Sequence, residues 1–147
     1  MATVYLSLGS NLGDRHALLG AALDMLQDRV GCMLALSPFY ETEPWGFESP
    51  HCFLNAVVVL RTAIGPRELL SVTQGIEKEL GRTHKSADGI YHDRPIDIDI
   101  LIHTSCPQMQ TEELILPHPH MWKRDFVRLP LLDVAPLLRL DEPLKTP

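Results

Sequence analysis

The chain has 147 residues and a hydrophobic content of 45%, which suits one domain with a sizeable core, and its net charge of −6 argues against a nucleic-acid-binding surface. Three cysteines at unrelated spacings form no disulfide framework, no apolar run is long enough to span a membrane, and the first residues lack the basic region of a signal peptide. We therefore expect one cytoplasmic domain over residues 1–147 that binds neither nucleic acid nor membrane.

The N-terminal quarter of the chain predicts a strand followed by a helix. Apolar residues alternate over Thr3–Ser7, which is typical of a strand. The turn Gly9–Asp14 follows, and its last residue can cap a helix that continues to Gly31. The helical spacing predicts a buried stripe of Leu19, Leu23 and Leu26.

The middle of the chain contains two further strands and a second helix. Residues 32–40 and residues 52–62 have strand patterns, with a polar loop between them. The later strand is apolar on both faces, which predicts a central position covered on both sides. Pro66 suits the first turn of a helix that ends at Gly81. The predicted buried stripe of this helix is Leu69, Val72, Ile76 and Leu80.

A fourth strand is predicted by the run Arg94-Pro95-Ile96-Asp97-Ile98-Asp99-Ile100-Leu101-Ile102. Alternation places one face of that strand in the core, made of Ile96, Ile98, Ile100 and Ile102. Asp97 and Asp99 then share the other face about 6.6 Å apart, close enough to repel unless a cation lies between them. Mg²⁺ is the natural candidate, and Arg94 suits a phosphate. The alternative is an edge strand with two ordinary surface acids.

The order of these elements predicts the fold class. Residues 107–113 have a loop composition, and the tail from Met121 to Leu138 has a helical pattern broken by Pro130 and Pro136. The order βαββαβ with a helical tail is typical of an α+β, ferredoxin-like fold, an antiparallel sheet with helices on one face. Because this fold hosts many functions, the function has to be argued from the site.

Other polar residues could contribute to a site near the two aspartates. The basic ones are Arg82, Lys85, His92, Arg94, His118, His120 and Arg124. Together with paired carboxylates they suit a metal–polyphosphate site, although solvated loop charges are the alternative. Asn55 lies inside an apolar strand beside Phe53, so it either satisfies a neighbouring loop or reads the polar edge of a heterocycle. A zinc site lacks a third ligand at a helpful spacing, and the turn at residues 9–14 lacks the lysine of a P-loop.

Several motifs, taken in order, make the chain similar to one enzyme family. They are Leu8-Gly9-Ser10-Asn11-Leu12-Gly13-Asp14, Tyr40-Glu41-Thr42-Glu43-Pro44-Trp45-Gly46, Phe53-Leu54-Asn55-Ala56, Glu77-Lys78-Glu79-Leu80-Gly81-Arg82, Arg94-Pro95-Ile96-Asp97-Ile98-Asp99, Leu116-Pro117-His118-Pro119 and Arg124-Asp125-Phe126-Val127. The chain resembles the 6-hydroxymethyl-7,8-dihydropterin pyrophosphokinases of folate biosynthesis. The resemblance implies transfer of pyrophosphate from ATP to the hydroxymethyl group of a reduced pterin, with release of AMP.

The resemblance also implies roles for individual residues. Two Mg²⁺ ions that bridge the ATP phosphates would be held by Asp97 and Asp99. The catalytic set would be Arg82, Arg94, Asp97 and Asp99. The pterin would lie between the rings of two phenylalanines, in a pocket of Thr42, Trp45, Phe53, Asn55 and Phe126. ATP would contact Gln74, Glu77, Arg82, Arg94, Ile100, His118 and Arg124. The expected partners are these two small molecules only, with the chain a monomer.

The chain departs from many relatives just before the fourth strand. It has Ile90-Tyr91-His92-Asp93-Arg94 where many relatives have Trp-Gly-Pro-Arg, so the place of that tryptophan is taken either by Tyr91 or by no residue. Two other functions stay open: a non-catalytic module that senses a small ligand, and another magnesium-dependent nucleotide enzyme such as a nucleotidyltransferase. The first would not need paired acids, arginines and stacking rings together. The second would release a product other than AMP.

Overall fold

The computed structural model describes residues 1–43, 51–81 and 95–134. Its main sheet consists of β1 (Ala2–Ser10), β2 (Gly31–Leu36), β3 (Tyr40–Thr42), β4 (Phe53–Thr62) and β5 (Asp97–His103). The other elements are α1 (Arg15–Arg29), α2 (Pro66–Glu79), α3 (Asp125–Val134), β6 (Met109–Gln110) and β7 (Ile115–Leu116). The four long strands lie in the order β2-β4-β1-β5, all pairs are antiparallel, and β3 pairs with β4.

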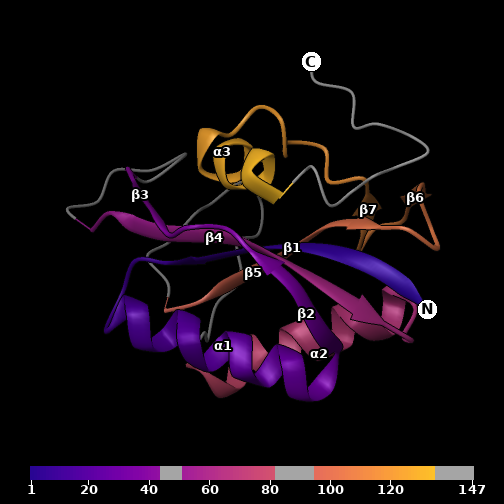
Figure 1. Ribbon diagram of the computed structural model, residues 1–147, viewed down its shortest axis with the longest axis horizontal. Helices are drawn as coiled ribbons and strands as arrows, with labels where there is room; N and C mark the ends of the chain where they lie inside the picture. Colours follow the sequence, from indigo (N-terminus) through magenta and orange to yellow (C-terminus); the bar gives the residue numbers. More distant parts are fainter. Residues whose placement is uncertain (44–50, 82–94, 135–147) are drawn as a thin grey trace.

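The arrangement confirms the predicted α+β, ferredoxin-like fold class. α1 and α2 cover one face of the sheet, and α3 from the C-terminal tail lies over the other (Figure 1). β4 is therefore central and covered on both sides, as its two apolar faces predict, and its residues from Phe53 to Leu60 are all buried. The helical tail thus supplies the second layer over the sheet.

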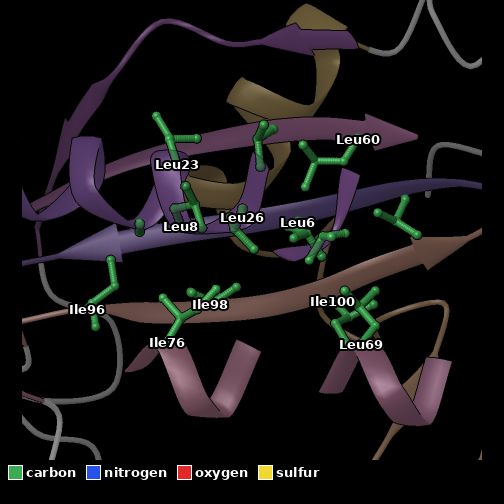
Figure 2. Close-up of a cluster of buried hydrophobic side chains, with 14 of the residues drawn as sticks. Leu6, Leu8, Leu23, Leu26, Leu60, Leu69, Ile76, Ile96, Ile98 and Ile100 are labelled. Carbon is green, nitrogen blue, oxygen red and sulfur yellow. The ribbon is translucent and has the colours of Figure 1, made fainter. Parts of the chain in front are cut away.

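The main core lies between the sheet and the first two helices (Figure 2). α1 contributes the predicted stripe together with an alanine, namely Leu19, Ala22, Leu23 and Leu26. α2 packs Leu69 near Ile100 and Ile76 near Ile98. Each fully buried side chain of this kind contributes about 1.5–3 kcal/mol. This packing fixes α2 beneath β5 and so fixes the strand that carries the paired aspartates.

The helix ends follow local chemistry, with one correction. The Asp14 carboxylate accepts a hydrogen bond from the Ala17 N–H at 3.1 Å and caps α1 as predicted. α2 ends just before Gly81, whose φ of +101° favours glycine. Gly31 stands at the same offset after α1, which ends at Arg29, but its φ is not positive, and it begins β2 instead of forming a left-handed cap. A Cβ at Gly31 would lie 1.8 Å from the carbonyl oxygen of Arg61, so only glycine allows this close strand pairing.

The predicted strand over residues 32–40 is two strands, β2 and β3. Ser37 still pairs with β4, because its N–H donates to the Val57 carbonyl and its Oγ accepts from the Val57 N–H, both at 2.9 Å. Pro38 then has no N–H to donate, which interrupts the strand. The interruption lets β3 start anew beside the first residues of β4.

The predicted core face of the fourth strand changes at its C-terminal end. The α1 and α2 side receives, as predicted, Ile96, Ile98 and Ile100. Ile102, however, packs on the α3 side, so its predicted position is wrong. The register between β1 and β5 shifts between Tyr5 and Leu6, which leaves Leu101 as an extra residue on β5. Such a bulge places consecutive residues on one face and so ends the alternation.

The C-terminal part of the described chain also differs from its prediction. The segment expected as a loop contains the two strands of a hairpin, β6 and β7. Pro130 does not break the helix but lies buried inside α3. Packing of α3 on the sheet outweighs the one hydrogen bond that a proline removes. Within the described ranges, no helix combines the length and the apolar character that crossing a lipid bilayer requires.

Candidate active site

One row of residues crosses three strands of the sheet. The pairing of β1 with β4 sets Gly9 opposite Asn55, and the pairing of β1 with β5 sets Gly9 opposite Asp97. Asp99 follows two residues along β5, opposite Ser7. Because directly paired residues point to the same face, Asn55 and Asp97 share a face with only a glycine between them. We call Asn55, Gly9 and Asp97 the site row.

The site row lies on the α3 side of the sheet. On each of the three strands, a residue two or four positions from the site row packs in one cluster with the buried residues of α3. These residues are Tyr5, Val57 and Leu101. Asp97 and Asp99 are partly exposed, whereas the isoleucines between and beyond them are buried on the opposite face. α3 therefore covers the apolar half of this face, and the polar half carries the aspartates, as the alternation predicts.

The paired carboxylates of Asp97 and Asp99 suit a hard divalent cation. Both are oxygen ligands, and both are partly exposed, so a cation could reach them without crossing the core. Among residues 1–43, 51–81 and 95–134, no three His, Cys, Asp or Glu side chains gather into a metal cage. Two carboxylates fit Mg²⁺, because protein sites for this ion commonly use one or two carboxylates and complete the shell with water and phosphate oxygens.

The other end of the site row carries a buried amide, that of Asn55. The Asn55 amide nitrogen donates to Thr42 Oγ1 at 2.7 Å, and this bond fixes the orientation of a side chain that is 2% exposed. A Cβ added to Gly9 would lie 2.8 Å from Asn55 Oδ1 and 3.4 Å from Cδ1 of the Phe53 ring. The amide and the ring therefore lie directly over the backbone of Gly9, and a larger residue there would displace them.

His118 and Arg124 approach the site row from the segment before α3. The His118 N–H donates to the Leu101 carbonyl at 2.9 Å, so this segment is tied to the open edge of β5. Arg124 is buried, and its guanidinium carbon lies 5.8 Å from the centre of the Phe126 ring. Burial, and then the positive charges of Arg124 and His120, lower the pKa of His118 to about 4, whereas the Asp97 carboxylate acts in the opposite direction. The imidazole is therefore neutral at physiological pH.

α2 places two further predicted residues beside the edge of β5. The Glu77 carboxylate is buried and accepts a hydrogen bond from the Ile98 N–H at 2.8 Å. Gln74 lies one turn earlier on α2 and is exposed. The side chain of Ile100 does not join them, because it lies in the core on the opposite face near Leu69 (Figure 2). Only its backbone could contribute to a site at this edge.

The comparison with protein families decides which family the site belongs to. A family described as 7,8-dihydro-6-hydroxymethylpterin-pyrophosphokinase (HPPK) matches residues 5–136, which include the whole site row and all of α3. The chain belongs to this family. Three predictions are thereby confirmed: the resemblance that the motifs indicated, the fold class, and the pyrophosphokinase activity.

Two bacterial relatives are similar to this HPPK chain over most of its length. A protein of Porphyromonas gingivalis (strain W83) named 2-amino-4-hydroxy-6-hydroxymethyldihydropteridine pyrophosphokinase is 69% identical over 143 residues, 97% of each chain. The protein of the same name from Bacillus subtilis (strain 168) is 42% identical over 132 residues, which are 89% of this chain and 77% of that one. Both matches thus cover at least 89% of this HPPK chain.

Solved structures share the fold at much lower identity. A structure of HPPK-DHPS in complex with substrates has a TM-score of 0.69 and 16% identity, and the match covers 92% of this chain and 40% of that one. A triple mutant of Plasmodium falciparum HPPK-DHPS with STZ-DHP has a TM-score of 0.75 and 17% identity, over 99% of this chain and 41% of that one. The HPPK chain described here thus spans about two fifths of the length of these structures.

Not every expected site residue of this HPPK chain can be placed. Trp45, Arg82 and Arg94 lie outside the described residues. The sequence reasoning missed Gly9, which it treated as part of a turn, and it missed the hydroxyl of Thr42, which orients the Asn55 amide. Both roles depend on which strands are neighbours, and no local pattern contains that information.

The lowered pKa of His118 predicts a pH dependence of folding stability. The unfolded chain binds a proton at this imidazole below the ordinary histidine pKa of 6.5, but the folded chain does so only below about 4. Stability is therefore lost as the pH falls from 6.5 towards 4, by up to about 3 kcal/mol from this group. Urea unfolding of the wild type and of His118→Gln between pH 7 and 4.5 measures the difference. Parallel curves for the two proteins would show that His118 titrates normally.

Proposed function

We propose that this chain transfers the pyrophosphate group of ATP to the hydroxymethyl oxygen of 6-hydroxymethyl-7,8-dihydropterin, as a step of folate biosynthesis. The hydroxymethyl oxygen forms a bond to the β-phosphorus, the bond between that phosphorus and the α-phosphate oxygen breaks, the alcohol proton is released, and AMP leaves. Family membership supports the reaction. The observation that carries the proposal for this chain's own residues is the site row.

The spacing within the site row matches the dimensions of the reaction. Neighbouring strands are about 4.8 Å apart, so Asn55 and Asp97 stand roughly 10 Å apart across two strand spacings. A bicyclic ring can meet the amide with its polar edge and direct its hydroxymethyl group towards the aspartates. Gly9, which has no side chain, lets the Asn55 amide and the Phe53 ring lie close against the backbone between them. A non-catalytic module that senses a small ligand would not need the two carboxylates at this distance from the amide.

We assign the pterin to the Asn55 end of the site row. The amide, oriented by the Thr42 hydroxyl, would hydrogen-bond the edge of the ring, with backbone groups of Thr42 and Trp45 beside it. Phe53 lies on the sheet, and Phe126 comes from the first turn of α3 above that face. A flat ring between two phenylalanines gains buried area and roughly 0.5–1.5 kcal/mol for each stacked contact.

Replacing Phe126 by alanine is expected to raise the KM for the pterin about tenfold and to leave the KM for ATP within twofold. One face of the proposed ring slot is lost, which removes a stacked contact and its buried area. Leu129→Ala is the matched control, because it also truncates an α3 side chain but one that is 38% exposed. Steady-state kinetics with each substrate varied separately measure the effect. An equal rise of both KM values would contradict the stacking assignment.

We assign ATP to the open edge of β5. The Ile98 N–H points away from β1 and towards Glu77, and hydrogen-bonding direction alternates along an antiparallel strand. The N–H and carbonyl of Ile100 therefore point to the same edge, where a donor and an acceptor could read the adenine. Gln74 and Glu77 border this edge from α2.

The phosphates would lie towards the hydrogen-bond donors of the site. We assign them to the guanidinium groups of Arg82, Arg94 and Arg124 and to the neutral imidazole of His118. His118 accepts a hydrogen bond from the His120 N–H at Nδ1, so the neutral ring carries its proton on Nε2 as a donor. Arg124 is already buried and held beside the Phe126 ring, so little of its freedom is lost on binding.

Asp97 and Asp99 would hold two Mg²⁺ ions. When bound, Mg²⁺ would neutralise the phosphate charge and polarise the bond to the β-phosphorus. The chain's own contribution is alignment: β5 fixes the two carboxylates, and the site row fixes the acceptor alcohol relative to them. Transfer at phosphorus depends mainly on such positioning and on charge stabilisation, so we assign no general base.

One product assay tests the proposal. The chain is mixed with ATP, Mg²⁺ and 6-hydroxymethyl-7,8-dihydropterin, and the products are separated by chromatography. AMP and the pterin diphosphate in equal amounts are expected. ADP would indicate transfer of a single phosphate, and free pyrophosphate would indicate a nucleotidyltransferase. The monomeric state and the cytoplasmic location stay predictions, and size-exclusion chromatography tests the first of them.

A further inference from the structure

Arg15 connects β3 to the residue that precedes β4. Its Nη1 donates to the carbonyl oxygen of Cys52 at 3.0 Å, and its Nη2 donates to Glu41 Oε2 at 3.4 Å. Glu41 is the middle residue of β3, and Cys52 immediately precedes Phe53 at the start of β4. One guanidinium therefore holds both strands at the point where they carry the pocket residues.

Asn11 adds a second contact to the same segment. Its Nδ2 donates to the carbonyl oxygen of His51 at 3.2 Å, and its side chain is almost fully buried. Two consecutive carbonyl groups are thus held, that of His51 by the turn that links β1 to α1 and that of Cys52 by the first residue of α1. This turn begins after Ser10, two residues beyond Gly9 of the site row, and it ends at the Asp14 cap of α1.

We propose that Arg15, supported by Asn11, is a positioning residue for the pterin. It fixes the position of Phe53 relative to Thr42, and it does not itself contact the pterin. The inference rests on the proposed function, because it takes the pterin to bind at these side chains. It also gives a role to Asn11 within the motif Gly9-Ser10-Asn11-Leu12-Gly13-Asp14, which resembles a phosphate loop only loosely.

The geometry distinguishes this role from simple stabilisation. The Arg15 and Glu41 side chains are 27% and 60% exposed, and ion pairs this exposed contribute little to folding. The carbonyl contact of Arg15, in contrast, lies one residue from a ring whose position determines the width of the slot. The groups assigned to ATP are on β5, on α2 and on residues 118–124, and none of the hydrogen bonds of Arg15 described above reaches them.

The test compares Arg15→Ala with Arg29→Ala. Arg29 is the matched control, because it is also an arginine of α1 that forms an ion pair with another element, here with Glu79 of α2. This ion pair involves none of the residues assigned to the pterin. We expect Arg15→Ala to raise the KM for the pterin about tenfold, since a charge-assisted hydrogen bond that fixes the pocket is lost. The KM for ATP should stay within about twofold, and the melting temperature should match that of the control.

A conservative variant and a binding measurement complete the test. Arg15→Lys keeps one positive charge but cannot bridge Glu41 and Cys52 with a rigid fork, so an intermediate KM for the pterin is expected. Pterin binding in the presence of a non-hydrolysable ATP analogue should weaken in the same order. Equal effects of Arg15→Ala and Arg29→Ala, or a matching rise in both KM values, would overturn the role of Arg15. Failure of the wild type to release AMP would instead overturn the proposed function.

Discussion

Replacing Asp97 by asparagine is expected to abolish pyrophosphate transfer and to leave the fold intact. The substitution keeps the shape of the side chain but removes one of two charges that we assign to Mg²⁺. Loss of several kcal/mol of charge stabilisation in the transition state lowers kcat about a thousandfold or more. The fold tolerates the change because Asp97 is partly exposed and lies opposite the core face of β5. Asp99→Asn is expected to behave in the same way.

Magnesium titration separates a metal ligand from a general structural role. A variant that has lost a ligand should need a higher Mg²⁺ concentration for half of its residual activity, whereas its melting temperature should stay near the wild-type value. Asp24→Asn is the control, because it neutralises an exposed carboxylate on α1 and should change neither quantity. Unfolding of Asp97→Asn, or an unchanged magnesium dependence with normal turnover, would show that the acids do not bind the metal.

The shared face of the two aspartates could be predicted because it depends on a local period. Side chains alternate along any strand, so the sequence alone separates Asp97 and Asp99 from Ile98 and Ile100. The cap at Asp14 could be predicted for a similar reason, since an N-cap bonds to a residue three positions away. These features need no knowledge of the rest of the fold.

The site row could not be predicted, because it depends on register between distant strands. Nothing local to Gly9 indicates that Asn55 and Asp97 are its neighbours on either side. The register is a global outcome of packing, and a shift of one residue would turn every side chain to the other face. The same reason explains why Gly9 was interpreted as a turn residue and why the orienting role of Thr42 was missed.

Tertiary packing also overrode two local signals. Pro130 predicts a broken helix, but the apolar stripe of α3 on the sheet keeps it helical. Glu77 is charged, yet it is buried, because the edge of β5 offers it the N–H of Ile98. The resemblance had assigned Glu77 to ATP, and the hydrogen bond adds a physical reason for a carboxylate at that place. In both cases the compensating group comes from another element.

Replacing Gly9 by alanine is expected to lower kcat/KM for the pterin about a hundredfold, because displacement of binding groups by an ångström or so can cost that much. The added methyl carbon would lie 2.8 Å from Asn55 Oδ1 and 3.4 Å from the Phe53 ring. The amide must move, and its hydrogen bond to Thr42, at 2.7 Å, is then lost or lengthened. The Phe53 ring, against which we place the pterin, would be pressed by the same methyl group. ATP binding should be unaffected.

Gly20→Ala is the matched control for this substitution. A Cβ added at Gly20, inside α1, meets no atom within 4 Å, so the same chemical change is free of steric conflict there. Alanine in a helix should raise stability by roughly 0.5–1 kcal/mol and leave both substrates unaffected. Pterin and ATP kinetics, together with melting temperatures, compare the two variants. If Gly9→Ala binds the pterin normally while remaining folded, the ring does not lie over the site row, and the assignment of that face to the pterin is wrong.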